Sequence, residues 1–122
     1  MAGTQRAKIA AEISAIQSEY YGKGPLRSKT YWQDDLVCVV LEETFTQAEK
    51  TLIRQGEIEP IRDIRRRFQQ VVADQFISVI EQATGRKVRV FVSETDVESD
   101  VSVEIFLLET EDSRTDMRSF EP

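Results

Sequence analysis

A long apolar stripe at helical spacing, between residues 60 and 85, constrains the fold more than any other feature of this sequence. Its members recur every three or four residues over about six turns: Ile61, Ile64, Phe68, Val72, Phe76, Val79 and Ala83. Pro60 fits the first turn of such a helix, where its missing N–H is no loss, and Gly85 is suited to end it. We therefore expect one long helix that packs its stripe onto a sheet.

Two shorter helices are expected before the long one. The first spans residues 5–20, with Thr4 as its cap and Gly22 as its stop. One stripe of this helix is apolar: Ile9, Ile13, Ile16 and Tyr20. The second is short and opens with Thr46 and Glu49, which are spaced as in a capping box. This box is the clearest local signal in the chain.

Four strands are predicted, in two hairpins. The first pair covers residues 26–32 and 36–42, joined by a tight polar turn at 33–35. The second pair covers residues 87–93 and 101–109, joined by an acidic connection. The order helix, hairpin, helix, helix, hairpin predicts an α+β fold, with a four-stranded, mainly antiparallel sheet packed against helices on one face.

The chain is expected to form one domain over residues 4–109. The acidic tail at 110–122 shows no periodicity, so we expect it to be mobile. A helix leading through a glycine into a hairpin occurs twice in the domain. This order suggests an internal α-β-β repeat, although residue identity between the halves is too low to establish one.

The strands are apolar on both faces, which a sheet covered by helices on one side does not require. In the first hairpin, Val37, Val39 and Leu41 lie opposite Leu36, Cys38 and Val40. In the second, Val88, Val90 and Val92 share a face, as do Val101, Val103, Ile105 and Leu107, opposite Phe91, Phe106 and Leu108. We expect the second face to be covered as well. A homodimer is the favoured explanation, and the alternative is that the long helix or the tail wraps over it.

Composition argues against several classes of function. The net charge of −6 disfavours sequence-independent nucleic-acid binding, which needs Lys and Arg to replace counterions along the phosphates. The chain has one cysteine and no histidine, so no disulfide, zinc site or cofactor is expected. Cys38 lies in an apolar run, where burial suppresses the reactive thiolate. No nucleophile motif or distinctive carboxylate pair is present, so we expect no catalytic residues and no enzyme activity.

No segment is apolar over the length needed to cross a bilayer. The first residues also lack the apolar region of a signal peptide. We therefore expect a cytoplasmic protein that reaches a membrane only through a partner.

The loop Gly22-Lys23-Gly24-Pro25 is a candidate anion site. Its glycines allow backbone N–H groups to approach a ligand closely, and Lys23 supplies positive charge. Arg27 and Lys29 follow at alternate positions of the next strand. A phosphate, nucleotide, bicarbonate or partner carboxylate would suit these groups. The alternative, which we favour, is that the loop only stops a helix and enters a hairpin; it lacks the spacing of a P-loop.

Arg62, Arg65, Arg66 and Arg67 form a candidate partner-binding cluster on the long helix. The alternative is a solvated face whose charges are paired within the helix. The acidic stretch at 94–100 lacks the spacing and central glycine of an EF-hand, so a solvated loop is expected there.

Three segments together resemble the MpsC-like family of bacterial proteins: the glycine loop at 22–25, the apolar strand at 35–41 and the capped helix start at 45–52. The resemblance continues through 64–68, 85–88 and 103–108, and covers residues 7–109. The family takes its name from a proposed sodium-translocating, membrane-potential-generating system. The resemblance implies an association with membrane transporters of cations or inorganic carbon, and it brings no established catalytic residues.

These observations predict a non-catalytic binding or assembly module, which the resemblance makes an accessory or regulatory subunit of a membrane transport system. An enzyme with an unrecognised site is a minor alternative, and two others stay open. One is an RNA- or ribosome-associated module, because the element order resembles some KH-type domains, although only Gly56 stands where those domains carry a Gly-x-x-Gly clamp. The other is a sensor of a small anion or nucleotide.

Overall fold

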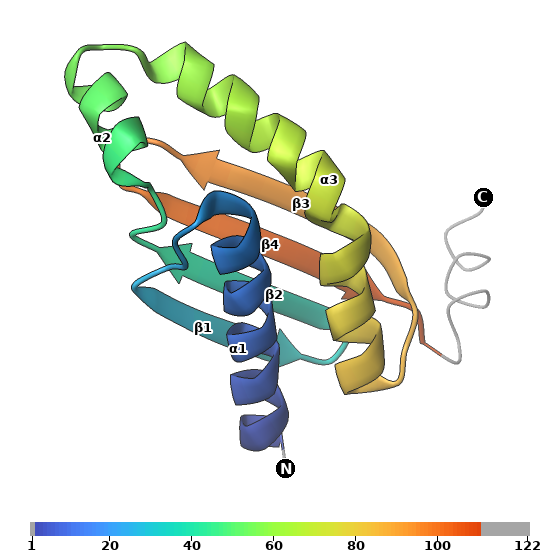
Figure 1. Ribbon diagram of the computed structural model, residues 1–122. Coiled ribbons are helices and arrows are strands. Elements are labelled where there is room, and N and C mark those ends of the chain that lie inside the picture. The colour runs from blue at the N-terminus through green and yellow to red at the C-terminus, as the bar shows by residue number, and fades with distance from the viewer. Residues whose placement is uncertain (1, 111–122) are drawn as a thin grey trace, which may run out of the picture.

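The computed structural model describes residues 2–110 and contains three helices and four strands (Figure 1). In chain order these are α1 (Ala2–Tyr21), β1 (Arg27–Gln33), β2 (Leu36–Glu42), α2 (Gln47–Arg54), α3 (Ile58–Thr84), β3 (Val88–Asp96) and β4 (Val101–Leu108). The tail expected to be mobile lies outside the described residues, except for Thr110.

All strand pairings are antiparallel, and the order across the sheet is β1-β2-β4-β3. This confirms the α+β fold with an antiparallel four-stranded sheet. The second strand of each hairpin lies at the centre and the first lies at an edge. Corresponding strands of the two α-β-β units therefore occupy equivalent places in the sheet, counted from its two edges.

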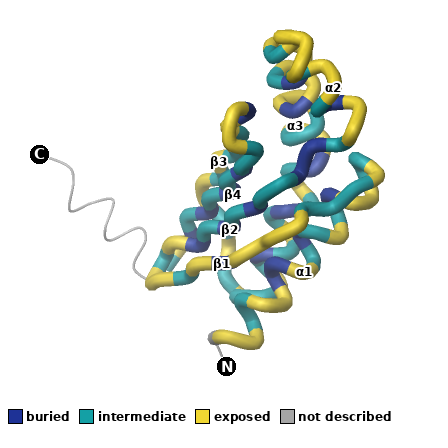
Figure 2. The backbone as a smooth tube through the Cα atoms, turned by 90° about the vertical axis from the view of Figure 1, so that its left-hand side faces the viewer, coloured by how far each residue is buried: buried dark blue, intermediate teal, exposed yellow. Residues whose placement is uncertain are grey.

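Helices α1 and α3 pack side by side on one face of the sheet, as Figure 1 and the turned view of Figure 2 show. One continuous core joins the two helices to β2 and β4: Ile9, Ile13, Val37, Val39, Leu41, Val72, Phe76, Ile80, Phe106 and Leu108. Burial of these side chains is the main favourable term in folding. The long helix therefore belongs to this layer, so the alternative in which it wraps over the second face is wrong.

A β-bulge corrects the predicted faces of the last hairpin. The register of β3 against β4 shifts between Val88 and Val90. An extra residue in one strand turns the side chains beyond it to the other face. Val88 therefore packs against the core together with Phe91, whereas Val90 and Val92 lie on the uncovered face. The expectation that the three valines share a face is wrong.

Two local predictions differ from the structure. Helix α1 begins at Ala2, so Thr4 lies inside it instead of capping it. In α3, Ile64 is exposed, whereas Arg65 and Ile80 are buried. The buried residues of α3 are mostly four apart in the sequence. The helix face that they form therefore differs slightly from the predicted stripe.

The acidic connection is only partly solvated, contrary to expectation. Val97 in the β3–β4 turn is buried and packs with Phe45 and Ile61 in a second, smaller core. Asp100 in the same turn has a φ of 54° and binds the segment after β2. The turn therefore holds the β2–α2 connection in place.

Candidate functional site

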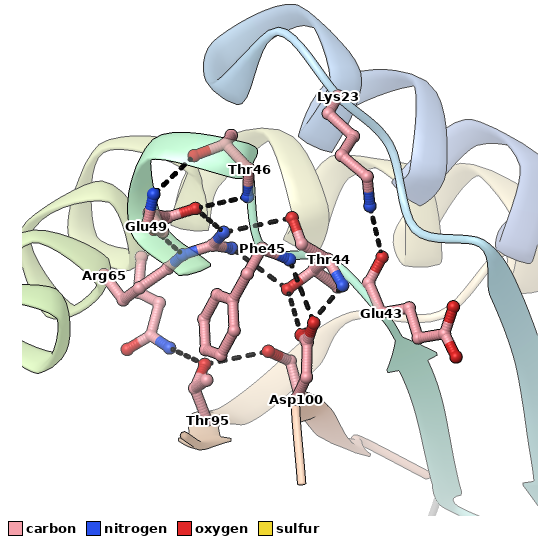
Figure 3. Close-up of polar contacts among 11 residues, drawn as sticks. Lys23, Glu43, Thr44, Phe45, Thr46, Glu49, Arg65, Thr95 and Asp100 are labelled. Carbon is pink, nitrogen blue, oxygen red and sulfur yellow. Dashed lines mark hydrogen bonds and ion pairs between the residues drawn. The ribbon is translucent and has the colours of Figure 1, made fainter. Parts of the chain in front are cut away.

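The glycine loop after α1 is fixed by contacts within the chain. Gly22 has a φ of 76°, and its N–H donates to a carbonyl of the last turn of α1 at 2.9 Å. A Cβ at Gly24 would lie 3.3 Å from a backbone oxygen of α1, so the loop lies close against the helix. Lys23 donates from Nζ to the backbone carbonyl of Glu43 at 2.6 Å (Figure 3). The loop thereby joins the end of α1 to the end of β2.

The two cations that follow the loop also have partners within the chain. Arg27 pairs with Glu42 and Glu43, each at 3.3 Å. The ammonium of Lys29 lies 4.9 Å from the centre of the Tyr31 ring. A carboxylate of Glu43 therefore stands beside Arg27, where the sequence predicted a bound anion. These contacts fit the helix-stop alternative, and the anion site stays a prediction.

The predicted arginine cluster divides into two parts. Arg62 pairs with Glu59 at 2.6 Å, and the exposed Arg66 lies 3.8 Å from Asp63. Arg67 is exposed as well. Arg66 and Arg67 are thus exposed to solvent, whereas Arg62 is half-buried. Arg65 points into the protein.

Arg65 is the centre of a buried polar network (Figure 3). Its Nε and Nη2 donate to the two carboxylate oxygens of Glu49 at 2.8 and 2.6 Å. It also donates to the carbonyl and hydroxyl oxygens of Thr44, at 3.1 and 3.3 Å. The guanidinium carbon lies 3.9 Å from the ring centre of Tyr21 and 4.9 Å from that of Phe45. Arginine is suited to this position because its planar fork binds a carboxylate bidentately and stacks on aromatic rings.

The network continues on both sides of Arg65. The Thr44 hydroxyl and N–H donate to Asp100, at 3.2 and 2.8 Å, which ties the β3–β4 turn to the start of α2. Glu49 also accepts from the Thr46 N–H at 2.8 Å, while its own N–H donates to the Thr46 hydroxyl at 3.2 Å. This is the predicted capping box, which the structure confirms. Glu49 therefore caps α2 and neutralises Arg65 at the same time.

The electrostatics of the network favour the charged pair. Burial on its own would raise the pKa of Glu49, but hydrogen bonds from Arg65 and Thr46 outweigh it and lower that pKa. Burial raises the pKa of Tyr21 to about 12, against the opposing charge of Arg65. At neutral pH the site therefore holds a carboxylate, a guanidinium and a neutral phenol.

An apolar pocket of about 350 Å³ lies beside this network, between α1, α2 and α3. Its walls are mainly apolar and aromatic: Tyr20, Tyr21, Ala48, Leu52, Pro60, Ile61, Ile64 and Phe68. Leu52 and Ile64 are 43% and 47% exposed, so the chain leaves these side chains without apolar cover. Glu49 and Tyr21 belong both to the pocket and to the network. The arrangement is suited to receive apolar side chains, with its walls held by buried hydrogen bonds.

A second buried polar group lies under the helices at the centre of the sheet. Glu104 is 2% exposed and shares one row across the sheet with Thr30 and Ser93. Glu104 Oε2 and the hydroxyls of Thr30, Ser93 and Ser14 lack a protein hydrogen-bond partner within residues 2–110. Burial raises the pKa of Glu104 to about 7, and the nearby Ser93 opposes this only in part.

Cys38 lies on the uncovered face of the sheet and is half-buried, not fully enclosed as its apolar run suggested. Burial, and then the charge of Glu104, raise the pKa of its thiol. Among the residues that the structure describes, no group of three or more His, Cys, Asp or Glu is placed to hold a metal ion.

The sequence pattern did not lead us to predict that Arg65 and Glu104 are buried. Glu104 alternates with Phe106 and Leu108, so its place on the buried face could have been read from the strand period. Arg65 had a weaker signal, its spacing of four residues from Ile61. Its partner Glu49 is 16 residues away in the sequence, and only the folded chain brings the two together.

The fold and site define a small α+β domain: an antiparallel sheet under two helices, with an apolar pocket beside a buried ion pair. The chain belongs to the MpsC family, described as the Na⁺-translocating membrane potential-generating system (MpsC), whose profile matches residues 2–110. No curated protein matches the chain, and no solved structure matches it either. No helix in the described part of the chain is long and apolar enough to cross a membrane.

Proposed function

We propose that this chain is a non-catalytic accessory or regulatory subunit of a Na⁺-translocating membrane system. It works on the cytoplasmic side and reaches the membrane through a protein partner. The family description supports the link to such a system. The observation that carries a docking role is the apolar pocket between α1, α2 and α3, where Leu52 and Ile64 stay exposed.

The pocket is suited to a protein partner because it is already formed in the free chain. The bonds from Arg65 to Glu49 and Thr44 hold α2 against α3. A site whose walls are fixed before binding loses less side-chain freedom when a partner enters. Apolar residues of a helix from a membrane subunit, spaced three and four apart, would fill such a groove.

Two matched substitutions on α3 test this docking role. Ile64→Asp puts a charge in the pocket, whereas Val71→Asp puts one on an exposed position outside it, since Val71 is 59% exposed and lines no part of the pocket. Purified full-length protein is added to membrane vesicles from a host strain that lacks the chain, and the bound fraction is measured by flotation.

Wild-type protein and Val71→Asp are expected to bind these vesicles with similar affinity, and Ile64→Asp to bind at least about tenfold more weakly. Vesicles of pure lipid are expected to bind none of the three proteins. Equal binding of Ile64→Asp and wild type, or binding to pure lipid, contradicts docking through the pocket.

The alternative functions have less support. RNA binding has less support because the link between α2 and α3 carries Gly56 beside the acidic Glu57. In addition, Arg65 is buried in the interior and cannot contact a phosphate. For anion sensing, the charges of Lys23 and Arg27 already meet oxygens of Glu43.

The proposed subunit acts as a homodimer. The sheet face opposite the helices is apolar, and no described element covers it. A second copy would remove this face from water.

A further inference from the structure

The uncovered sheet face carries a continuous apolar patch. Its most exposed members are Tyr31, Leu36, Val90 and Val92, which are 36–51% exposed. Half-buried apolar side chains of the two central strands lie between them: Cys38, Val40, Val101, Val103, Ile105 and Leu107. An antiparallel sheet with one open face normally shows polar residues there.

The strand register arranges this face in rows that run across the sheet. One row contains Tyr31, Cys38, Ile105 and Val92, in the order β1, β2, β4, β3. The next row contains Lys29, Val40, Val103 and Glu94. The last contains Arg27, Glu42, Val101 and Asp96. The first two rows therefore run from one edge strand to the other through apolar residues, whereas the last passes through Glu42 and Val101.

Charge is divided between the two edges of the patch. The β1 edge carries Arg27 and Lys29, and the β3 edge carries Glu94 and Asp96 in the same two rows. Arg27 is already paired with Glu42 in its own chain, whereas Lys29 has no ion pair among the described residues. Lys29 and Glu94 are three strands apart, about 14 Å, so they cannot pair within one chain.

We propose that a second copy of this chain covers the patch, related by a two-fold axis parallel to the strands, so that Lys29 of each copy faces Glu94 of the other. Rotation about such an axis places β1 of one copy over β3 of the other. It also aligns each row of one copy with the same row of the other. The positive edge then lies on the negative edge at both ends of the interface. This inference rests on the homodimer proposed above and specifies its geometry.

Charge distinguishes this arrangement from the other face-to-face dimer. A two-fold axis perpendicular to the strands stacks β1 on β1 and β3 on β3. The edge with Arg27 and Lys29 would then meet itself, as would the edge with Glu94 and Asp96. Like charges facing each other across an interface are unfavourable, and opposite charges set the register.

The test reverses the charge of Lys29 in one variant and the charge of Glu94 in another. Lys29→Glu alone opposes Glu94 with a second carboxylate at both ends of the dimer, and Glu94→Lys alone opposes Lys29 with a second ammonium. Each single variant is expected to raise the dimer dissociation constant by about tenfold. An equimolar mixture of the two variants is expected to form heterodimers, because both of its contacts are again between opposite charges.

Native mass spectrometry and sedimentation equilibrium of the full chain report these species. Lys8→Glu and Glu19→Lys, both on exposed positions of α1, are the control pair. The control variants, alone or mixed, are expected to dimerise as the wild type does. The proposed axis is supported if the mixture of Lys29→Glu and Glu94→Lys contains more heterodimer than random pairing would give, and the control mixture does not.

Other outcomes overturn the proposal in distinguishable ways. A wild-type dimer that is insensitive to both single variants, or whose variants are not rescued by mixing, overturns the parallel axis and leaves the homodimer standing. A wild type that stays monomeric overturns both, while the vesicle assay still reports on the docking pocket.

Cys38 gives a second, independent readout. It lies next to the proposed axis, so the two copies would hold their Cys38 Cα atoms about 11 Å apart, from a sheet spacing of about 10 Å and a strand spacing of about 4.8 Å. This is too far for a disulfide, which needs Cα atoms within about 7 Å. Copper-catalysed oxidation is therefore expected to form no disulfide between the two copies. A dimer linked by a Cys38–Cys38 disulfide contradicts the proposed axis.

Discussion

The guanidinium of Arg65 on α3 binds both carboxylate oxygens of Glu49 on α2, and the two side chains are only 3% and 11% exposed. Arg65 also reaches Thr44, which in turn binds Asp100 in the β3–β4 turn. One buried side chain thus joins three separate segments at the wall of the apolar pocket.

Removal of the buried arginine is expected to destabilise the protein strongly. Arg65→Ala leaves the Glu49 carboxylate buried without its partner, which typically costs about 3–5 kcal/mol in the free energy of unfolding. Arg66→Ala is the matched control, because Arg66 is exposed and its ion pair is long. Its expected cost is within about 0.5 kcal/mol. Urea denaturation measures both values, and similar costs for the two variants contradict the role given to Arg65.

The capping box should contribute a measurable share of stability. Thr46→Ala removes the hydroxyl that accepts the Glu49 N–H, and is expected to cost about 1 kcal/mol. Thr51→Ala is the control, since the exposed Thr51 hydroxyl donates to the Gln47 carbonyl and accepts from Arg54, and both bonds lie within its own helix. Equal destabilisation by the two changes, read from urea midpoints at constant slope, argues against a specific cap.

Glu104 should make stability fall as the pH rises. Its pKa is about 7 in the folded chain and 4.5 as a free group, so the folded state binds the proton more tightly. Its contribution is full below pH 4.5, declines between these two values and levels off above about 7. The loss amounts to about 3 kcal/mol. Glu49 has a lowered pKa, so its contribution is lost only under more acidic conditions.

Glu104→Gln keeps the shape of this side chain without its titration. The variant is expected to match the wild type near pH 4 and to be more stable near pH 8. Urea unfolding across this range gives the difference directly. Parallel pH profiles for the two proteins would show that Glu104 is ionised, or solvated, at all of these pH values.

Local signals in the sequence predicted much of the fold. The range of β2, the turn after β1 and the capping box at Thr46 all depend on neighbouring residues, and the structure confirms them. The apolar character of both faces of β2 and β4 also followed from simple alternation.

The features that the sequence did not predict depend on distant contacts. The bulge in β3 changes which valines face the helices, and nothing in the order of those residues marks it. The burial of Arg65 depends on Glu49, Thr44 and Tyr21, which come from three other parts of the chain. The pocket is likewise formed by side chains of three helices, and its existence depends on how those helices meet.

Sodium-dependent membrane potential is the most direct test of the proposed role. It is measured with a voltage-sensitive dye in cells that lack the chain and carry a restored copy. Wild type and Val71→Asp are expected to restore the potential, and Ile64→Asp, if folded as judged by its thermal unfolding, is expected not to. A potential that is unchanged by loss of the chain, or fully restored by Ile64→Asp, contradicts an accessory subunit that docks through this pocket.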